Sequence, residues 1–193
     1  MPREGVFARV VHGGVISVGD TMEIEPRETP LPWQAAVITL SDQGAAGMRE
    51  DKSGPVIAER LRQNGYEVIE QLLLPDDRAR LEKELIRLCD QRQPDLILTT
   101  GGTGFSARDI TPEATLAVAE RQVPGIAEAI RTESMRITKR AMLSRAVSVI
   151  RGKTLIVNLP GSPKAVKESL EYIIDPLAHG IEIMTGEAGN CAR

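Results

Sequence analysis

Histidine, cysteine and aromatic residues are scarce in this sequence, and each scarcity argues against a class of function. Two of the 193 residues are histidines, two are cysteines, and aromatic residues make up 3% of the chain. Neither cysteine belongs to a CxxC or Cys/His cluster, so no disulfide framework or structural zinc site is expected. With so few aromatic side chains, platforms for stacking nucleic-acid bases are not expected either.

An excess of positive charge and long apolar runs are also missing. The chain has 24 Lys and Arg against 27 Asp and Glu, a formal net charge of −3. No basic face for nucleic acid is implied, so no nucleic-acid partner is expected. No run approaches the roughly 18 apolar residues of a membrane span, and the N-terminus lacks the apolar core of a secretion signal. We expect a soluble, cytoplasmic protein with no membrane partner.

The first thirty residues differ in pattern from the rest of the chain. Apolar and polar residues alternate loosely on both sides of Gly13-Gly14, and a proline-rich connector follows. This pattern predicts a β-hairpin, a turn at the two glycines and a stiff linker. A hairpin of this size buries too little surface to fold alone, so it must pack on the main domain or on a neighbouring subunit. We expect the hairpin and linker over residues 1–30 and one main domain over residues 31–193.

From residue 35 onward, strand-like and helical patterns alternate. The runs at 35–42, 66–74, 95–100 and 154–158 are rich in apolar and β-branched residues, which is typical of buried strands. The alternation predicts an α/β fold, a three-layer sandwich with a mostly parallel central sheet and helices on both faces. The expected helices run from Ser53 as N-cap to Asn64-Gly65, through Leu81, Leu85 and Leu88 to about Gln91, from Thr111 to Gln122, from Pro124 to Ile137, and from Ser162-Pro163 with a kink or break at Pro176.

Three glycine-bearing loops follow strands of this predicted sheet. Their sequences are SDQGAAGMREDKSG, GGTGFSARD and NLPGSPK. Ligands of open α/β sheets bind in the crevice beyond the carboxyl ends of the strands, so all three loops are expected at one site. His12 and His179 lie outside these loops, and no serine or cysteine there has a base to pair with. Chemistry of the nucleophilic-triad kind is therefore not expected.

Taken one at a time, each candidate residue fits both a structural and a functional interpretation. The GGTG loop fits either an anion cradle or a tight turn, and it matches neither GxxxxGK[ST] nor GxGxxG. Asp109 fits an N-cap of the helix from Thr111, and Asp51 fits a solvated loop charge, but together they also fit a Mg²⁺ site. Ser134 and Ser144 fit either structural hydroxyls or groups of the site.

Four segments together resemble the molybdopterin-binding domain of the MogA/MoaB family. The segments are SDQGAAGMREDKSGP, ILTTGGTGFSARDITPEAT, MLSR and TLIVNLPGSPKAV, and the resemblance covers residues from about 34 to 186. It is closest to the molybdopterin adenylyltransferases of molybdenum cofactor biosynthesis. It implies a cytoplasmic homotrimer that transfers AMP from Mg·ATP to the terminal phosphate of molybdopterin and releases pyrophosphate. A molybdenum insertase is a candidate partner.

The resemblance also implies roles for single residues. Asp51 and Asp109 match the two essential acids of the family and are expected to be catalytic and to hold Mg²⁺. Ser134 and Ser144 match polar groups near the pterin phosphate. The other positions expected to contact nucleotide or pterin are Ser41, Asp42, Gly101, Gly102, Thr103, Gly104, Pro160, Gly161, Ser162 and Pro163.

Two features depart from the family pattern. Gln43 stands where members often carry a basic residue, which is expected to weaken one charged contact with substrate. Residues 5–24 resemble the last portion of a MOSC domain but lack the cysteine of a sulfur-transfer site. This segment is expected to serve in structure or assembly, or to be a vestigial hairpin that caps the sheet or a subunit interface.

Three other functions compete with adenylyl transfer. A non-catalytic molybdopterin-binding or scaffolding module would share the fold, but loss of the acids is expected there and both are present. A metal-insertion domain normally sits in a longer chain than this one. A generic nucleotide hydrolase is disfavoured because the sequence has no P-loop.

Overall fold

The computed structural model describes residues 13–21 and 31–186. The chain divides into two units, Met1–Leu31 and Pro32–Arg193. The first unit is described only in part, so most of the expected hairpin, and most of the segment that resembles a MOSC domain, lie outside the described residues.

The described part of the first unit contains one turn and no strand. The backbone N–H of Asp20 donates to the carbonyl of Ser17 over 3.1 Å, and the N–H of Ser17 donates to Asp20 Oδ2 over 2.7 Å. Gly19 in this turn has a φ of +102°, a conformation that favours glycine. The turn therefore falls at Gly19 and not at the expected Gly13-Gly14.

The second unit is built on a six-stranded sheet with the order β2-β1-β3-β6-β5-β4. The first four strands in this order are parallel, and β5 and β4 continue the sheet in antiparallel pairing. A largely parallel sheet is thus confirmed, and its parallel strands end together at one edge. The strands are β1 (Gln34–Leu40), β2 (Glu67–Leu74), β3 (Leu96–Thr100), β4 (Arg121–Gln122), β5 (Ser148–Arg151) and β6 (Thr154–Leu159).

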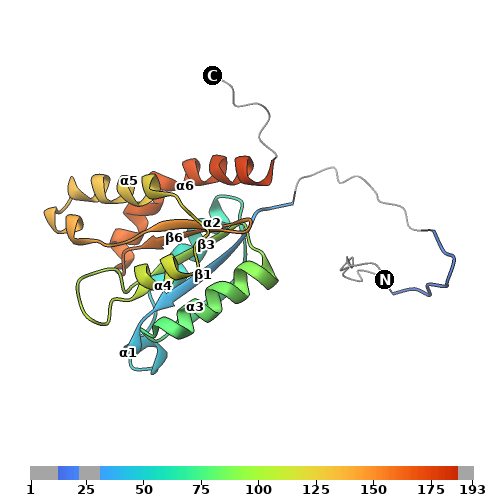
Figure 1. Cartoon of the computed structure of the whole chain (residues 1–193), viewed down its shortest axis with the longest axis horizontal. Coiled ribbons are helices and arrows are strands. Elements are labelled where there is room, and N and C mark those ends of the chain that lie inside the picture. Colours follow the sequence, from blue (N-terminus) through green and yellow to red (C-terminus); the bar gives the residue numbers. More distant parts are fainter. Residues whose placement is uncertain (1–12, 22–30, 187–193) are drawn as a thin grey trace, which may run out of the picture. The chain divides into compact units, whose positions relative to one another are not determined.

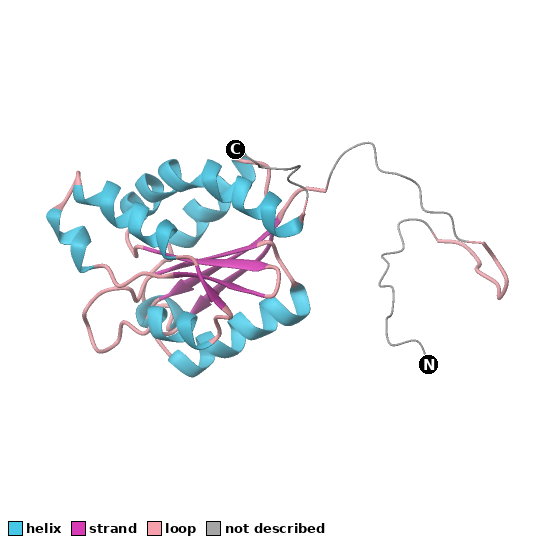
Figure 2. Ribbon diagram, turned by 45° about the horizontal axis from the view of Figure 1, so that its top comes forward, coloured by secondary structure: helices cyan, strands magenta, loops and turns pink. Residues whose placement is uncertain are grey.

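Helices cover both faces of this sheet, as Figures 1 and 2 show. Successive residues of a strand point to opposite faces, so Val37 and Leu98 pack in one core cluster while Ile38 and Ile97 pack in the other. The first cluster includes residues of α2 (Ser53–Gln63), α5 (Pro124–Met135) and α6 (Pro163–Thr185), and the second includes residues of α3 (Arg78–Arg87), the π-helix η1 (Leu88–Arg92) and α4 (Thr111–Ala117). The expected three-layer sandwich is confirmed.

Several helix ends differ from the expectation. The helix from Thr111 ends at Ala117, because Arg121 and Gln122 form β4 and pair with β5. The N-cap of α2 is Lys52 and not Ser53, which is already helical.

Two further helices end elsewhere or continue. The helix expected to reach Ile137 ends at Met135. Helix α6 continues through Pro176 to Thr185 without a break. Pro176 and Tyr172, four residues before it, both lie on the exposed side of α6, where water can replace the missing N–H.

Candidate active site

Asp51 lies two residues before helix α2, at the carboxyl edge of the sheet. Its Oδ1 accepts the backbone N–H groups of Ser53 at 2.9 Å and of Gly54 at 3.0 Å. These are two of the four N–H groups that the start of a helix leaves without a partner in the helix. Asp51 is therefore not the freely solvated charge that one interpretation of the sequence expected, and it does the capping expected of Ser53.

The other oxygen of Asp51 faces a buried hydroxyl. A Cβ built on Gly54 would stand 2.4 Å from Asp51 Oδ2 and 2.6 Å from Thr39 Oγ1. The side chain of Thr39 is 6% exposed, and its hydroxyl has no hydrogen-bond partner among the described residues. Two oxygens thus converge over the backbone of Gly54, where a larger residue would displace both of them.

The backbone conformation and close packing of the GGTG loop require glycine at its first two positions. Gly101 and Gly102 have φ angles of +95° and +63°. A Cβ on Gly101 would stand 2.4 Å from the carbonyl oxygen of Leu40, and one on Gly102 would stand 2.5 Å from Thr111 Oγ1. The Thr111 hydroxyl also donates to the carbonyl of Gly101 over 2.9 Å. The backbone of the loop therefore passes close to the end of β1 at Leu40 and to the start of α4 at Thr111.

Asp109 closes the same loop and does not cap the following helix. Its Oδ2 accepts the N–H of Ser106 over 2.7 Å, whereas the N-cap of α4 is Ile110, which makes no side-chain cap bond. The carbonyl of Asp109 accepts a bond from the Arg145 guanidinium over 2.6 Å. The N-cap expected of Asp109 is thus wrong, because its carboxylate turns back into its own loop.

The loop after β6 is tied to both other loops. The hydroxyl of Ser53 donates to the carbonyl of Gly161 over 2.9 Å, and the hydroxyl of Thr100 donates to the carbonyl of Pro160 over 2.6 Å. Ser162 caps α6 by accepting the N–H of Ala165 over 3.2 Å. Pro160, Gly161 and Ser162 therefore lie beside the end of β3, as the sequence predicts.

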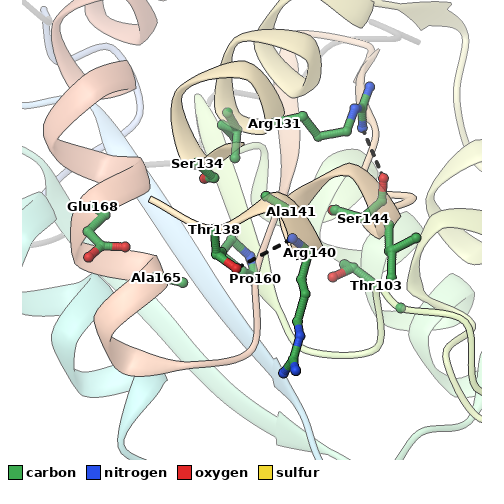
Figure 3. Close-up of a pocket in the computed structure, with 13 residues that line it drawn as sticks. Thr103, Arg131, Ser134, Thr138, Arg140, Ala141, Ser144, Pro160, Ala165 and Glu168 are labelled. Atoms are coloured by element: carbon green, nitrogen blue, oxygen red, sulfur yellow. Dashed lines mark hydrogen bonds between the residues drawn. The ribbon is translucent and has the colours of Figure 1, made fainter. Parts of the chain in front are cut away.

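Two cavities open at these tied loops. The first, here called the serine cavity, measures about 300 Å³ and is shown in Figure 3 with Glu168 and Ser144 on opposite sides. The second, the Asp51 cavity, measures about 270 Å³. The serine cavity includes Thr103, Gly104, Arg131, Ser134, Arg140, Ser144 and Pro160, and the Asp51 cavity includes Thr39, Ser41, Arg49, Asp51, Lys52, Gly101, Gly161 and Pro163.

The same two loops line both cavities, and the site residues predicted from the sequence are distributed between the two. From the two loops 101–104 and 160–163, Thr103, Gly104 and Pro160 line the serine cavity, whereas Gly101, Gly161 and Pro163 line the Asp51 cavity. Gly102 and Ser162, which were also expected at the site, line neither cavity. Asp109 lines a separate hollow of about 480 Å³ together with Phe105 and Glu113. Asp51 and Asp109 therefore line different hollows in this structure.

Asp42 lines neither cavity, because its carboxylate is held elsewhere. Arg108 binds it through two nitrogens, with Nε 3.0 Å from Asp42 Oδ2. Asp42 and Asp76 also exchange backbone-to-carboxylate bonds of 3.0 and 3.1 Å. The hydrogen bond from Arg108 holds the pKa of Asp42 below its usual value, whereas burial raises the pKa of Asp76. Asp42 thus joins two loops in this structure.

Several basic residues of the cavities were not among the predicted site residues. Arg131 and Arg140 line the serine cavity, and Arg49 and Lys52 line the Asp51 cavity. Within the described part of the chain, Arg140 is paired with no carboxylate, while Arg131 donates to the carbonyl of Ala146 over 2.8 Å. The sequence offered one indication of Arg131: it lies three residues before the predicted site residue Ser134 on a helix, and residues at that spacing share a face.

The described residues contain no group of three or more His, Cys, Asp or Glu side chains placed to hold a metal ion. An ion at this edge would take few protein carboxylates, which is the usual state of protein-bound Mg²⁺ with substrate phosphates. Within the same residues, no helix is long and apolar enough to cross a membrane.

Comparison with known proteins identifies the family. The model of a family described as "Probable molybdopterin binding domain" matches residues 36–179. The chain belongs to this family. The match spans the three loops of the candidate site, and it confirms the resemblance to MogA and MoaB proteins.

Individual relatives of this molybdopterin-binding domain agree. A molybdopterin adenylyltransferase of Escherichia coli K12 is 43% identical over 152 residues, which are 75% of this chain and 77% of that protein. One from Helicobacter pylori J99 is 41% identical and covers 78% and 86% of the two chains. The crystal structure of the molybdopterin biosynthesis enzyme MoaB from Thermus thermophilus matches with a TM-score of 0.76 and 44% sequence identity. The match covers 80% of this chain and 97% of the MoaB chain.

Proposed function

We propose that this protein is a molybdopterin adenylyltransferase. It transfers AMP from ATP to the terminal phosphate of molybdopterin and releases pyrophosphate, as a step of molybdenum cofactor biosynthesis. The observation that carries the proposal is the pair of cavities that share the loops 101–104 and 160–163. Ligands bound in the two cavities would contact neighbouring residues of the same two loops, and this nearness is what a transfer between two phosphorylated molecules requires.

The charges of each cavity support an assignment of the two ligands. The terminal phosphate of the pterin binds in the serine cavity, near Ser134, Ser144 and the guanidinium of Arg140. The triphosphate of ATP binds in the Asp51 cavity, near Arg49 and Lys52. Backbone N–H groups at the start of α2 and α6 add positive potential at this edge.

The reaction depends on alignment of the two substrates and on neutralisation of phosphate charge, and it requires no strong general base. A phosphate monoester is an anion near neutral pH, so its oxygen attacks the α-phosphorus of ATP without prior removal of a proton by a side chain. The new bond joins that oxygen to the α-phosphorus, and the bond from the α-phosphorus to the bridging oxygen breaks as pyrophosphate leaves. In-line alignment and fixed donors supply most of the rate in such transfers.

The residues present fit a magnesium ion in the Asp51 cavity. Asp51 Oδ2 is not used by the cap of α2, and the buried Thr39 hydroxyl beside it lacks a partner within the described chain. Both are hard oxygen donors of the kind that Mg²⁺ prefers. The ion, when bound with ATP, neutralises charge on the phosphates. Asp109 acts from the neighbouring hollow, where its carboxylate lies against Gly104.

We extend the family resemblance to the assembly and setting of the enzyme. A homotrimer is the expected oligomer, a molybdenum insertase is the expected recipient of the product, and the cytoplasm is the expected location.

Pyrophosphate release tests the proposal. The native chain with ATP and Mg²⁺ is expected to release pyrophosphate only when molybdopterin is added, and EDTA is expected to stop the release. Tight binding of molybdopterin with no release would contradict the proposal and favour a non-catalytic binding module. Release without molybdopterin would instead favour a nucleotide hydrolase.

A further inference from the structure

Arg145 joins several parts of the chain around the loop that follows β3. Its backbone N–H donates to the carbonyl of Thr103 over 2.9 Å. Its guanidinium donates to the carbonyl of Gly104 over 2.7 Å and to that of Asp109 over 2.6 Å, and it pairs with the carboxylate of Glu113. One arginine thus contacts the start and the end of the loop after β3 and the helix that follows.

The loop has few other anchors. Residues 105–108 are exposed, and Phe105 at the tip is 70% exposed, so apolar burial does not fix the loop. Its internal bonds link Ser106 and Asp109, and its external ion pair links the exposed side chains of Arg108 and Asp42. Exposed ion pairs contribute little to stability. Within the described structure, the hydrogen bonds that tie the carbonyls of Gly104 and Asp109 to residues outside the loop come from Arg145.

Arg145 is itself held by its neighbours. Arg131 of α5 donates to the carbonyls of Ala146 and Ser144, on both sides of Arg145, and Figure 3 shows the bond to Ser144. Burial is the largest single influence on the pKa of Glu113 and opposes its ionisation, but the hydrogen bonds from Arg145 and from the backbone of Glu113, together with nearby positive charge, outweigh it, and the pKa is lowered. The pair is charged at neutral pH, and a planar guanidinium reaches three acceptors that an ammonium group cannot reach together.

We propose that Arg145, oriented by Glu113, is a positioning residue that sets the loop 103–109 against the serine cavity. It touches neither ligand; it fixes Thr103 and Gly104 in the cavity wall and Asp109 behind them. This inference rests on the proposed function for its effect on catalysis, but the restraint on the loop is a property of the protein alone.

The experiment compares Arg145→Lys and Glu113→Gln with the matched control Arg151→Lys. Arg151 also binds a carboxylate through two nitrogens, at 2.9 and 2.8 Å from Asp90, and also donates to a carbonyl, that of Val118. It lies in β5 beside Thr154, at the other end of β6 from the site loops.

Three readouts, amide exchange, kcat and the Kd of Mg·ATP, separate the restraint from catalysis. Hydrogen exchange of the backbone amides in residues 103–109 is expected to accelerate at least about tenfold in Arg145→Lys and less in Glu113→Gln, as local opening becomes easier. The kcat of pterin-dependent pyrophosphate release is expected to fall about 100-fold in Arg145→Lys, the scale of a misplacement near 1 Å. The Kd of Mg·ATP alone is expected to stay native, because Arg145 does not line the Asp51 cavity. Arg151→Lys is expected to change none of the three.

If the backbone amides of residues 103–109 exchange at the native rate in both variants, the inference is overturned, whether or not the enzyme is active. So would a native kcat in an Arg145→Lys protein whose loop exchanges faster. Should Arg145→Lys fail to fold, amide exchange and kcat of Glu113→Gln decide. Failure of the native chain to release pyrophosphate would contradict the proposed function, and the exchange data would still decide the restraint.

Discussion

At the scale of single residues, Asp51 has two tasks that its two oxygens divide. Oδ1 caps helix α2, and Oδ2 faces the buried hydroxyl of Thr39. Asparagine caps a helix about as well as aspartate does, but it carries no charge and is a poor ligand for Mg²⁺. The two tasks can therefore be separated by substitution.

Asp51→Asn is expected to lower kcat/KM for pyrophosphate release at least about 100-fold, with little change in the free energy of unfolding. Asp51→Ala is expected to lose the activity and, in addition, about 1 kcal/mol of stability. Asp77 provides the control, since it caps α3 by accepting the N–H of Arg80 over 2.8 Å. Asp77→Asn and Asp77→Ala should repeat the stability changes at native activity. Full turnover by Asp51→Asn would refute the assignment.

Gly54 is the second position where one residue decides the site. A side chain there must push away Asp51 Oδ2 and Thr39 Oγ1, whereas a Cβ on Gly180 in α6 meets nothing within 4 Å. Gly180→Ala is expected to stabilise the protein by about 0.4–1 kcal/mol against urea. Gly54→Ala is expected to show none of this gain and to lose activity. Equal gains in both variants with native activity would contradict the described contact.

At the scale of elements, the strands were predictable and the helix ends were not. β1, β3 and β6 are buried on both faces, so their apolar runs are a local signal. The end of α4 depends on pairing between Gln122 and Val149, and no local pattern shows such a partner. Pro176 breaks the local rule for helices, but the exposed side of α6 tolerates it.

The site was predictable in its loops and less so in its contacts. Glycine-bearing loops at strand ends mark the edge of the sheet, and Asp51, Gly101 and Gly161 of these loops do line a cavity there. Their roles in the reaction stay predictions. Asp42 was expected to contact substrate, but its partner Arg108 lies 66 residues away in the sequence. Long-range pairs of this kind come from the packing of loops, which residue spacing does not encode.

The pair of Asp42 and Arg108 connects two loops and makes their stability depend on pH. The hydrogen bond from Arg108 lowers the pKa of Asp42 in the folded protein. A carboxylate with a lowered pKa stabilises the fold above the pKa of the unfolded chain, about 3.9, and this stabilisation is lost as the pH falls below it. Because the pair is exposed, Asp42→Asn is therefore expected to lower the Tm slightly at pH 6 and to lower it progressively less as the pH falls below about 3.9. A constant difference in Tm over this range would contradict the account.

At the scale of the whole molecule, burial of Cys89 in the core makes the stability of the fold depend on pH in the alkaline range. Burial, the largest cause, raises the pKa of this thiol from 9.0 to about 11. The unfolded chain then ionises first, so stability falls as the pH rises from about 9 toward 11. The stability advantage of the native chain over Cys89→Ala should shrink by about 1.4 kcal/mol between pH 8 and pH 10 in urea unfolding. An unchanged advantage would show that the thiol is not shielded.

In the described part of the molecule, the serine cavity and the Asp51 cavity lie at one edge of the sheet, and the central claim is that an adenylyl group passes between their ligands. The most direct measurement follows the label of ATP carrying ³²P at either the α or the γ position, with molybdopterin and Mg²⁺ present. The account predicts that the α label appears in the pterin product and the γ label in pyrophosphate. Release of the γ label as inorganic phosphate, with no α label in the pterin, would contradict it.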